Sequence, residues 1–248
     1  MTPTWLQETA ERFWWDAGGA TEFPRNIERA AIYALSLGIV SLPRLWISDL
    51  MCWMEQRGLK CPFQGSDRPL SGCLLAYSGR GLVIINGQDS EDERRFTVAH
   101  EVAHFILDYL DVRRCVVDSL GALALEVMDG KRPATSEERA NAVLTNAPMG
   151  VHTHSMNRTQ GGDIFQGTVL KAEDDADLLA LELLAPAKEV WTRLAAKTES
   201  SFRELMECAT QVLKGEFGLP DAIAKPYAYK LADTLTRGPS ISEWLGLR

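Results

Sequence analysis

The segment His100-Glu101-Val102-Ala103-His104 constrains the fold of this chain most, because it places two histidines four residues apart in a predicted helix. Ser90 and Glu93 form the S-x-x-E pattern of a helix N-terminus, and apolar residues at helical spacing predict a helix from about Asp92 to Tyr109. Side chains four residues apart lie on one face of a helix. Both imidazoles can therefore bind one Zn²⁺ ion, with Glu101 placed to act on a water molecule at the metal.

Short apolar runs before this helix predict a small sheet. Cys73–Tyr77 and Leu82–Asn86 are separated by Ser78-Gly79-Arg80-Gly81, which is typical of a β-hairpin. Between Asn26 and Arg57, apolar residues recur at helical spacing and are interrupted at Pro43, which predicts two packed helices. The pattern indicates an α+β fold with N-terminal helices, a small sheet and the helix that carries the histidines.

The composition changes twice beyond that helix. Residues 129–162 are rich in Gly, Pro, Asn, Thr and Ser, and we expect an irregular insertion there. Helical patterning resumes from Glu173 to Leu184 and continues in several short helices. We therefore divide the chain into residues 1–186, with the N-terminal helices, the core and the insertion, and a helical C-terminal region, residues 187–248.

A catalytic zinc site needs a third protein ligand and an open fourth position. The segment Glu173-Asp174-Asp175-Ala176-Asp177 opens a predicted helix and offers carboxylates for that role. Glu173 and Asp177 are four residues apart, so one can bind the metal while the other accepts the N–H of a ligand histidine. Asp174 and Asp175 are alternatives as the ligand. An acidic first turn also complements the helix dipole, whether or not a metal binds.

Cys115 follows His104 by 11 residues. If the chain folds back there, its thiolate can occupy the open metal position and hold an enzyme inactive until a signal withdraws it. A buried free cysteine without such a role is the commoner case.

Other histidines and tyrosines are weaker candidates. His152 and His154 could form a second metal pair, but alternate residues in a polar loop favour exposed side chains. A hydrogen-bond donor that stabilises an oxyanion is also expected in a peptidase. The candidates for it are His152, His154, Tyr109, Tyr227 and Tyr229.

The composition indicates a globular chain, with 46% hydrophobic and 24% charged residues. With 26 Lys and Arg against 34 Asp and Glu, the net charge is −8, which argues against a surface built to coat nucleic acid. Residues 187–248 carry nine basic and eight acidic residues, so the argument against nucleic-acid binding is weaker there.

The five cysteines form no CxxC pair, and neither a signal sequence nor a membrane span is expected. We expect a cytoplasmic protein.

Two blocks of this sequence resemble the ImmA/IrrE family of metallopeptidases. Arg95–Leu107 is similar to the family's active-site helix, and Ile84-Ile85-Asn86 is similar to the strand ending that precedes it. Glu173–Pro186 is similar to the second block, whose leading glutamate is the third ligand. The resemblance implies that Glu173 binds the zinc ion and that Asp177 is its companion. The interval between the two blocks is longer than is usual in the family.

The resemblance also implies a function. It implies a zincin-like zinc endopeptidase in which Glu101 takes a proton from water and delivers it to the leaving amine. Members cleave a helix-turn-helix repressor, usually encoded nearby, and so release genes for stress response, mobile-element transfer or antiphage defence, often after DNA damage. Single-stranded DNA is a candidate activator.

The C-terminal region leaves two interpretations open. Residues 204–235 resemble the helix-turn-helix-like segment that follows the family's core, but a helical cap packed on that core explains them equally well. The alternative to an enzyme is a DNA- or repressor-binding regulator, in which Cys115 completes a closed structural zinc site.

Overall fold

The computed structural model describes residues 3–20, 22–59, 66–136, 138–139, 152–157, 167–194 and 201–236. Its elements follow in chain order: α1 (Thr4–Asp16), α2 (Ile27–Ala34), β1 (Leu37–Leu42), α3 (Ile47–Glu55), β2 (Leu70–Tyr77), β3 (Arg80–Asn86), α4 (Glu91–His104), the π-helical turn η1 (Phe105–Leu110), α5 (Asp111–Leu120), α6 (Ala124–Met128), β4 (His152–Asn157), α8 (Gly167–Leu184), α9 (Ala187–Leu194), α10 (Phe202–Gly215) and α11 (Asp221–Thr236).

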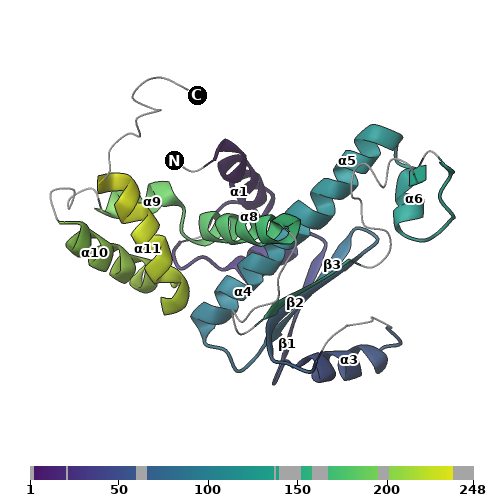
Figure 1. The fold of residues 1–248 in the computed structure, drawn as a ribbon, viewed down its shortest axis with the longest axis horizontal. Coiled ribbons are helices and arrows are strands. Elements are labelled where there is room, and N and C mark those ends of the chain that lie inside the picture. The colour runs from purple at the N-terminus through teal and green to yellow at the C-terminus, as the bar shows by residue number, and fades with distance from the viewer. Residues whose placement is uncertain are drawn as a thin grey trace.

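A four-stranded sheet in the order β1-β3-β2-β4 lies between helices (Figure 1). β2 is antiparallel to both of its neighbours, and β1 runs parallel to β3. Alternate residues of β2 face opposite sides of a sheet. Leu74 and Ala76 belong to the main core beneath α4 and α8, whereas Cys73 and Leu75 pack with α3 on the other face. The α+β fold with a small sheet is confirmed.

The predicted hairpin and the helix after it are both present. β2 and β3 pair with Leu74 opposite Val83, and the capping box at Ser90 and Glu93 starts α4. The helical path does not end at Tyr109, because η1 and α5 extend it without a break to Leu120. A π-helical turn inside an α-helix often marks a functional site, and here it begins directly after His104.

The prediction of two packed helices between Asn26 and Arg57 is wrong in its middle part. α2 ends at Ala34, and Leu37–Leu42 form β1 at the edge of the sheet. The apolar residues of this short run fit either helix or strand spacing. Pairing with β3, where Ile39 lies opposite Val83, decides the outcome, and no local pattern could show it.

The predicted irregular insertion contains a strand. β4 pairs with β2, and His152 lies opposite Ala76. At the start of the insertion, the backbone carbonyl of Asp129 accepts a hydrogen bond from the Tyr77 hydroxyl (2.8 Å). The insertion therefore leaves from and returns to the same end of β2. The expectation of irregular structure is wrong for residues 152–157, and most of the remaining insertion lies outside the described residues.

The C-terminal helices pack onto the core. One buried cluster joins residues of α1, α2 and α4 to residues of α8, α9, α10 and α11, and α9 to α11 lie together at one end of the molecule (Figure 1). Arg95 of α4 donates to the carbonyl of Gly218 between α10 and α11 (2.9 Å), and the Tyr227 hydroxyl donates to the carbonyl of Ala185 (3.1 Å). The proposed boundary at residues 186 and 187 stays a prediction. None of the helices in the described part of the chain is both long and apolar enough to cross a bilayer.

Candidate metal centre

The His-Glu-x-x-His segment lies in the buried part of α4. His100, Glu101 and His104 are each at most 2% exposed. Apolar residues on the same helix explain this burial, since Val98 and Val102 are fully enclosed between α4 and its neighbours. Burying two imidazoles and a carboxylate is costly unless they are paired or bind a metal. Their partners therefore indicate what the site does.

Three ligand atoms form a compact triangle. Nε2 of His100 lies 3.0 Å from Nε2 of His104. Oε2 of Glu173, on α8, lies 3.5 Å from the first nitrogen and 3.7 Å from the second. Ligand atoms at about 2.0–2.1 Å from a tetrahedral zinc ion are about 3.3 Å apart. The triangle has the dimensions of three corners of such a site.

Each α4 histidine is oriented by a carboxylate on its other nitrogen. Nδ1 of His100 donates to Asp177 Oδ1 (2.9 Å), and Nδ1 of His104 donates to Asp108 Oδ2 (2.5 Å). An ionised carboxylate only accepts hydrogen bonds, so these contacts place the proton on Nδ1 and leave a lone pair on Nε2. Two lone pairs that face each other at 3.0 Å repel unless a positive charge lies between them. The donor set therefore fits a metal ion.

A third histidine enters the group from β4. His154 Nδ1 lies 3.0 Å from Glu101 Oε2, and His154 Nε2 lies 2.8 Å from Glu173 Oε1. Its ring stacks on that of His104, with centroids 3.7 Å apart. The expectation that His154 is exposed in a loop is wrong. Among the described residues, His100, His104, His154 and Glu173 form one group of potential ligands.

The charges of this group are strongly coupled. Burial disfavours an imidazolium, but the carboxylates of Asp177 and Glu173 outweigh it and raise the pKa of His100 to about 9. Glu101 and Glu173 act in the same way on His154 and raise its pKa to about 10. Burial also opposes the ionised carboxylates, yet the histidines hold the pKa of Glu173 and of Glu101 below their usual range. Without a metal, protons supply the positive charge that the carboxylates require.

Cys115 is not brought to this group. It is exposed on α5, on the same continuous helical path as His104. Eleven residues at 1.5 Å each put it about 16 Å farther along the axis. The fold-back that would make Cys115 a zinc ligand does not occur, because η1 and α5 continue the helix where a turn was expected.

The other residues considered as metal ligands or oxyanion donors lie outside the histidine group or have other partners. Asp174 and Asp175 are outside the group of potential ligands, and Lys171 lies 3.9 Å from Asp175. The Tyr109 hydroxyl accepts from the N–H of Gly79, and Tyr229 packs against Phe202. The side chain of His152 lies outside the described residues. Sequence reasoning missed Asp108, although its position four residues after His104 on a helix was a usable signal.

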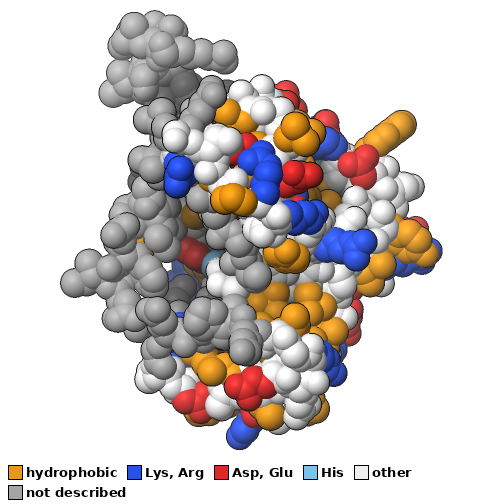
Figure 2. Space-filling view, turned by 90° about the vertical axis from the view of Figure 1, so that its right-hand side faces the viewer, with side chains coloured by type: hydrophobic (Ala, Val, Ile, Leu, Met, Phe, Trp, Pro, Cys, Tyr) orange, Lys and Arg blue, Asp and Glu red, His pale blue; other side chains and the backbone are white. Residues whose placement is uncertain are grey.

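The site is open to solvent on one side. The side chains of Glu173 and Asp177 are 40% and 51% exposed, whereas that of His154 is 15% exposed. In Figure 2, a histidine side chain and an acidic side chain are visible in a recess of the molecule.

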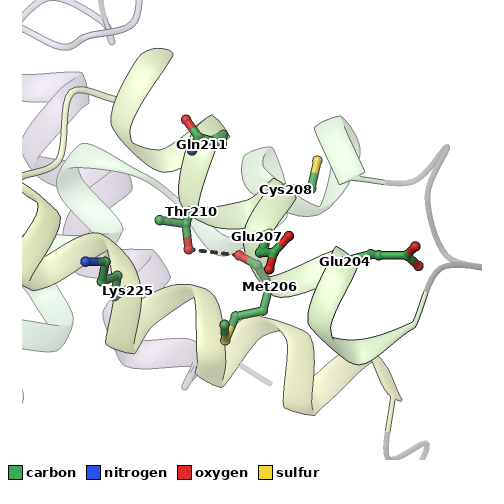
Figure 3. A pocket seen from close by; sticks show the side chains of 7 residues that line it. All are labelled: Glu204, Met206, Glu207, Cys208, Thr210, Gln211 and Lys225. Atoms are coloured by element: carbon green, nitrogen blue, oxygen red, sulfur yellow. Dashed lines mark hydrogen bonds between the residues drawn. The ribbon is translucent and has the colours of Figure 1, made fainter.

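A separate surface groove on α10 and α11 is drawn in Figure 3, where the Thr210 hydroxyl donates to the carbonyl of Met206 (2.8 Å). None of the lining residues of that groove belongs to the histidine group.

A helix with the His-Glu-x-x-His segment, facing a glutamate from a second helix, defines a site of the metallopeptidase class. Residues 61–147 match the family model of the IrrE N-terminal-like domain, peptidase family M78. The ImmA/IrrE resemblance is thereby confirmed for this part of the chain. The match includes α4 and ends before β4 and α8, so His154 and Glu173 lie outside it. No curated protein is similar enough to this chain to count as a match.

Proposed function

We propose that this protein is a zinc-dependent endopeptidase with Glu101 as its general base. The observation that carries the proposal is the triangle of His100 Nε2, His104 Nε2 and Glu173 Oε2, with edges of 3.0, 3.5 and 3.7 Å. Zinc suits this mixture of imidazole and carboxylate ligands, and three protein ligands leave a fourth position for water or substrate.

The state of Glu101 supports the same role. Its Oε1 atom is buried and has no hydrogen-bond partner among the described residues. An unpaired acceptor at such a depth is costly unless a donor occupies the adjoining space. When bound, zinc supplies a Lewis acid that polarises the scissile carbonyl and lowers the pKa of water. Glu101 accepts the water proton and delivers it to the leaving amine.

The substrate in this proposal is a helix-turn-helix repressor encoded nearby. Its cleavage would release genes for stress response or antiphage defence, in response to DNA damage and with single-stranded DNA as an activator. The support is the ImmA/IrrE resemblance together with the net charge of −8, which complements a basic DNA-binding protein. We place this reaction in the cytoplasm.

A regulator with a purely structural zinc site is the alternative. Cys115 cannot be the fourth ligand of such a structural site, because it lies on α5, away from the histidine group. Incubation with the repressor, with and without a chelator, separates the two functions. Site-specific products that the chelator abolishes indicate a peptidase, and binding without products indicates a regulator.

The decisive variant is Glu101→Gln. We expect it to retain zinc, because His100, His104 and Glu173 are unchanged, and to cleave the repressor about 100- to 10,000-fold more slowly. Glu91→Gln is the matched control, since Glu91 is exposed at the start of the same helix and pairs with Arg95. Repressor cleavage is followed by electrophoresis, and bound zinc is measured by elemental analysis. An undiminished rate in Glu101→Gln would rule out the proposed mechanism.

A further inference from the structure

We propose that His154 is a positioning residue that fixes the general base and the third metal ligand relative to each other. The proposal rests on the function proposed above. It assigns a role to β4 within the insertion, a part of the chain for which the ImmA/IrrE resemblance provides no explanation.

His154 determines which oxygen of each carboxylate is available. Its Nε2 contacts Glu173 Oε1 at 2.8 Å, so that Oε2 of the same carboxylate faces the α4 histidines. Its Nδ1 contacts Glu101 Oε2 at 3.0 Å, which leaves the buried Oε1 as the unpaired acceptor. One imidazole therefore holds one oxygen of each of two carboxylates. The other oxygen of Glu173 faces the α4 histidines, and the other oxygen of Glu101 stays buried and unpaired near Gly72 of β2.

The ring orientation of His154 argues against a role as a fourth ligand. An imidazole binds a metal through a lone pair in the plane of its ring. The rings of His154 and His104 are stacked, with an interplanar angle of 25° and centroids 3.7 Å apart. Two nearly parallel planes at this separation do not meet at an ion about 2 Å from both nitrogens. In addition, both nitrogens of His154 already contact carboxylates.

The strand pairing explains how His154 reaches this position. On β4, His154 lies opposite Leu74 of β2, and Leu74 belongs to the core on the α4 side of the sheet. Successive strand residues point to opposite faces. The neighbouring Thr153 is exposed accordingly. The pairing of β4 with β2 thus brings the imidazole over α4, between Glu101 and Glu173.

The test compares His154→Ala and His154→Gln with the control Thr153→Ala in the full-length protein. Thr153 is on the same strand but points away from the site. Zinc affinity is measured by competition with a chromophoric chelator, and the ligand sphere is followed by the visible spectrum of the Co²⁺-substituted protein. We expect His154→Ala to lower zinc affinity about 10- to 100-fold without changing the Co²⁺ spectrum, as for other residues that orient a ligand. His154→Gln can still donate one hydrogen bond and should recover part of the loss.

Cleavage kinetics provide an independent measurement. We expect His154→Ala, when saturated with zinc, to have a lower kcat with little change in KM, because the base is less well oriented. Wild-type zinc affinity and wild-type kcat in His154→Ala would overturn the proposal. So would a Co²⁺ spectrum that shows the loss of a ligand, since His154 would then bind the metal. If His154→Ala does not fold, as judged by circular dichroism, His154→Gln decides by the same criteria. The zinc and Co²⁺ measurements need no substrate, so they test His154 even if the protein is not a peptidase. Failure of the proposed function would show as absence of cleavage by the wild-type protein.

Discussion

Two segments, α4 and β4, bring histidines to the same metal centre, and they do so by different means. The position of His100 and His104 follows from signals within about 15 residues, namely the capping box, the helical spacing and the apolar flanks. The position of His154 depends on the pairing of β4 with β2, where it lies opposite Leu74. Residues 74 and 154 are far apart in the chain.

The histidines on helix α4 are more deeply buried than the histidine on strand β4. The side chains of the α4 histidines are at most 3% exposed, whereas that of His154 is 15% exposed on an outer strand of the sheet. A helix satisfies its backbone hydrogen bonds internally, but a strand depends on its neighbour. We therefore expect the α4 residues to determine whether a metal binds, and the β4 residue to adjust how well it binds.

The largest expected effect is that of His104→Ala, which removes a ligand supplied by α4. Zinc binding should fall by more than about 100-fold, beyond the range expected for a residue that only orients a ligand. The measurement is the same chelator competition that is used for His154→Ala. If the two variants lost affinity equally, the distinction between the two segments would be wrong.

The elements that could be predicted from the sequence are those that residues close together in the chain determine. The β2–β3 hairpin, the start of α4 and the proximity of Glu173 to the α4 histidines follow from spacing or from the family resemblance. Strand β1 and strand β4 were missed because their pairing partners lie elsewhere in the chain. β4 has the sequence His-Thr-His-Ser-Met-Asn, which contains only one large apolar residue and resembles a polar loop. Cys115 was misplaced because the end of the helix was predicted too early.

The second largest effect concerns Asp129, which directly follows α6 at the start of the insertion. Its side chain is 5% exposed and contacts Arg113 at 2.7 Å and Ser78 at 3.2 Å. Asp129→Ala leaves the largely buried guanidinium of Arg113 without this partner, and we expect the free energy of unfolding to fall by about 2–3 kcal/mol. Asp118→Ala removes an exposed carboxylate from α5 and should cost less than about 0.5 kcal/mol. Urea denaturation measures both, and equal stability of the two variants would show that the start of the insertion is not anchored by this ion pair.

The same ion pair predicts a pH dependence. The hydrogen bond from Arg113 holds the pKa of Asp129 below its usual value. A pKa that is lower in the folded state than in the unfolded state contributes stability that is complete above the unfolded value, near 3.9. That contribution is lost as the pH falls through the folded pKa. The difference in unfolding free energy between the wild-type protein and Asp129→Ala should therefore be constant near neutral pH and decrease below about pH 4.

The smallest expected effect is at Gly72, the residue of β2 where α4 and β4 meet. Gly72 lies opposite Met156 of β4, and a Cβ atom added to it would be 2.5 Å from Thr97 Cγ2 and 3.0 Å from Glu101 Oε1. Thr97 is buried and β-branched, so its methyl group cannot move aside easily. We expect Gly72→Ala to lower the free energy of unfolding by about 1–3 kcal/mol and to reduce kcat by displacing Glu101.

Gly38→Ala on β1 is the matched control, because its added Cβ would meet only the end of the Leu82 side chain, at 3.3 Å. Thermal or urea unfolding compares the two alanine variants, and zinc affinity is measured for both. Because the atoms nearest to the added Cβ belong to Thr97 and Glu101 and not to a metal ligand, Gly72→Ala should reduce kcat more than zinc affinity. A loss of zinc affinity as large as that of His154→Ala would mean that the added methyl group disturbs β4 instead of α4. The two segments would then be coupled through β2, and their separate contributions to the site could not be assigned from single substitutions.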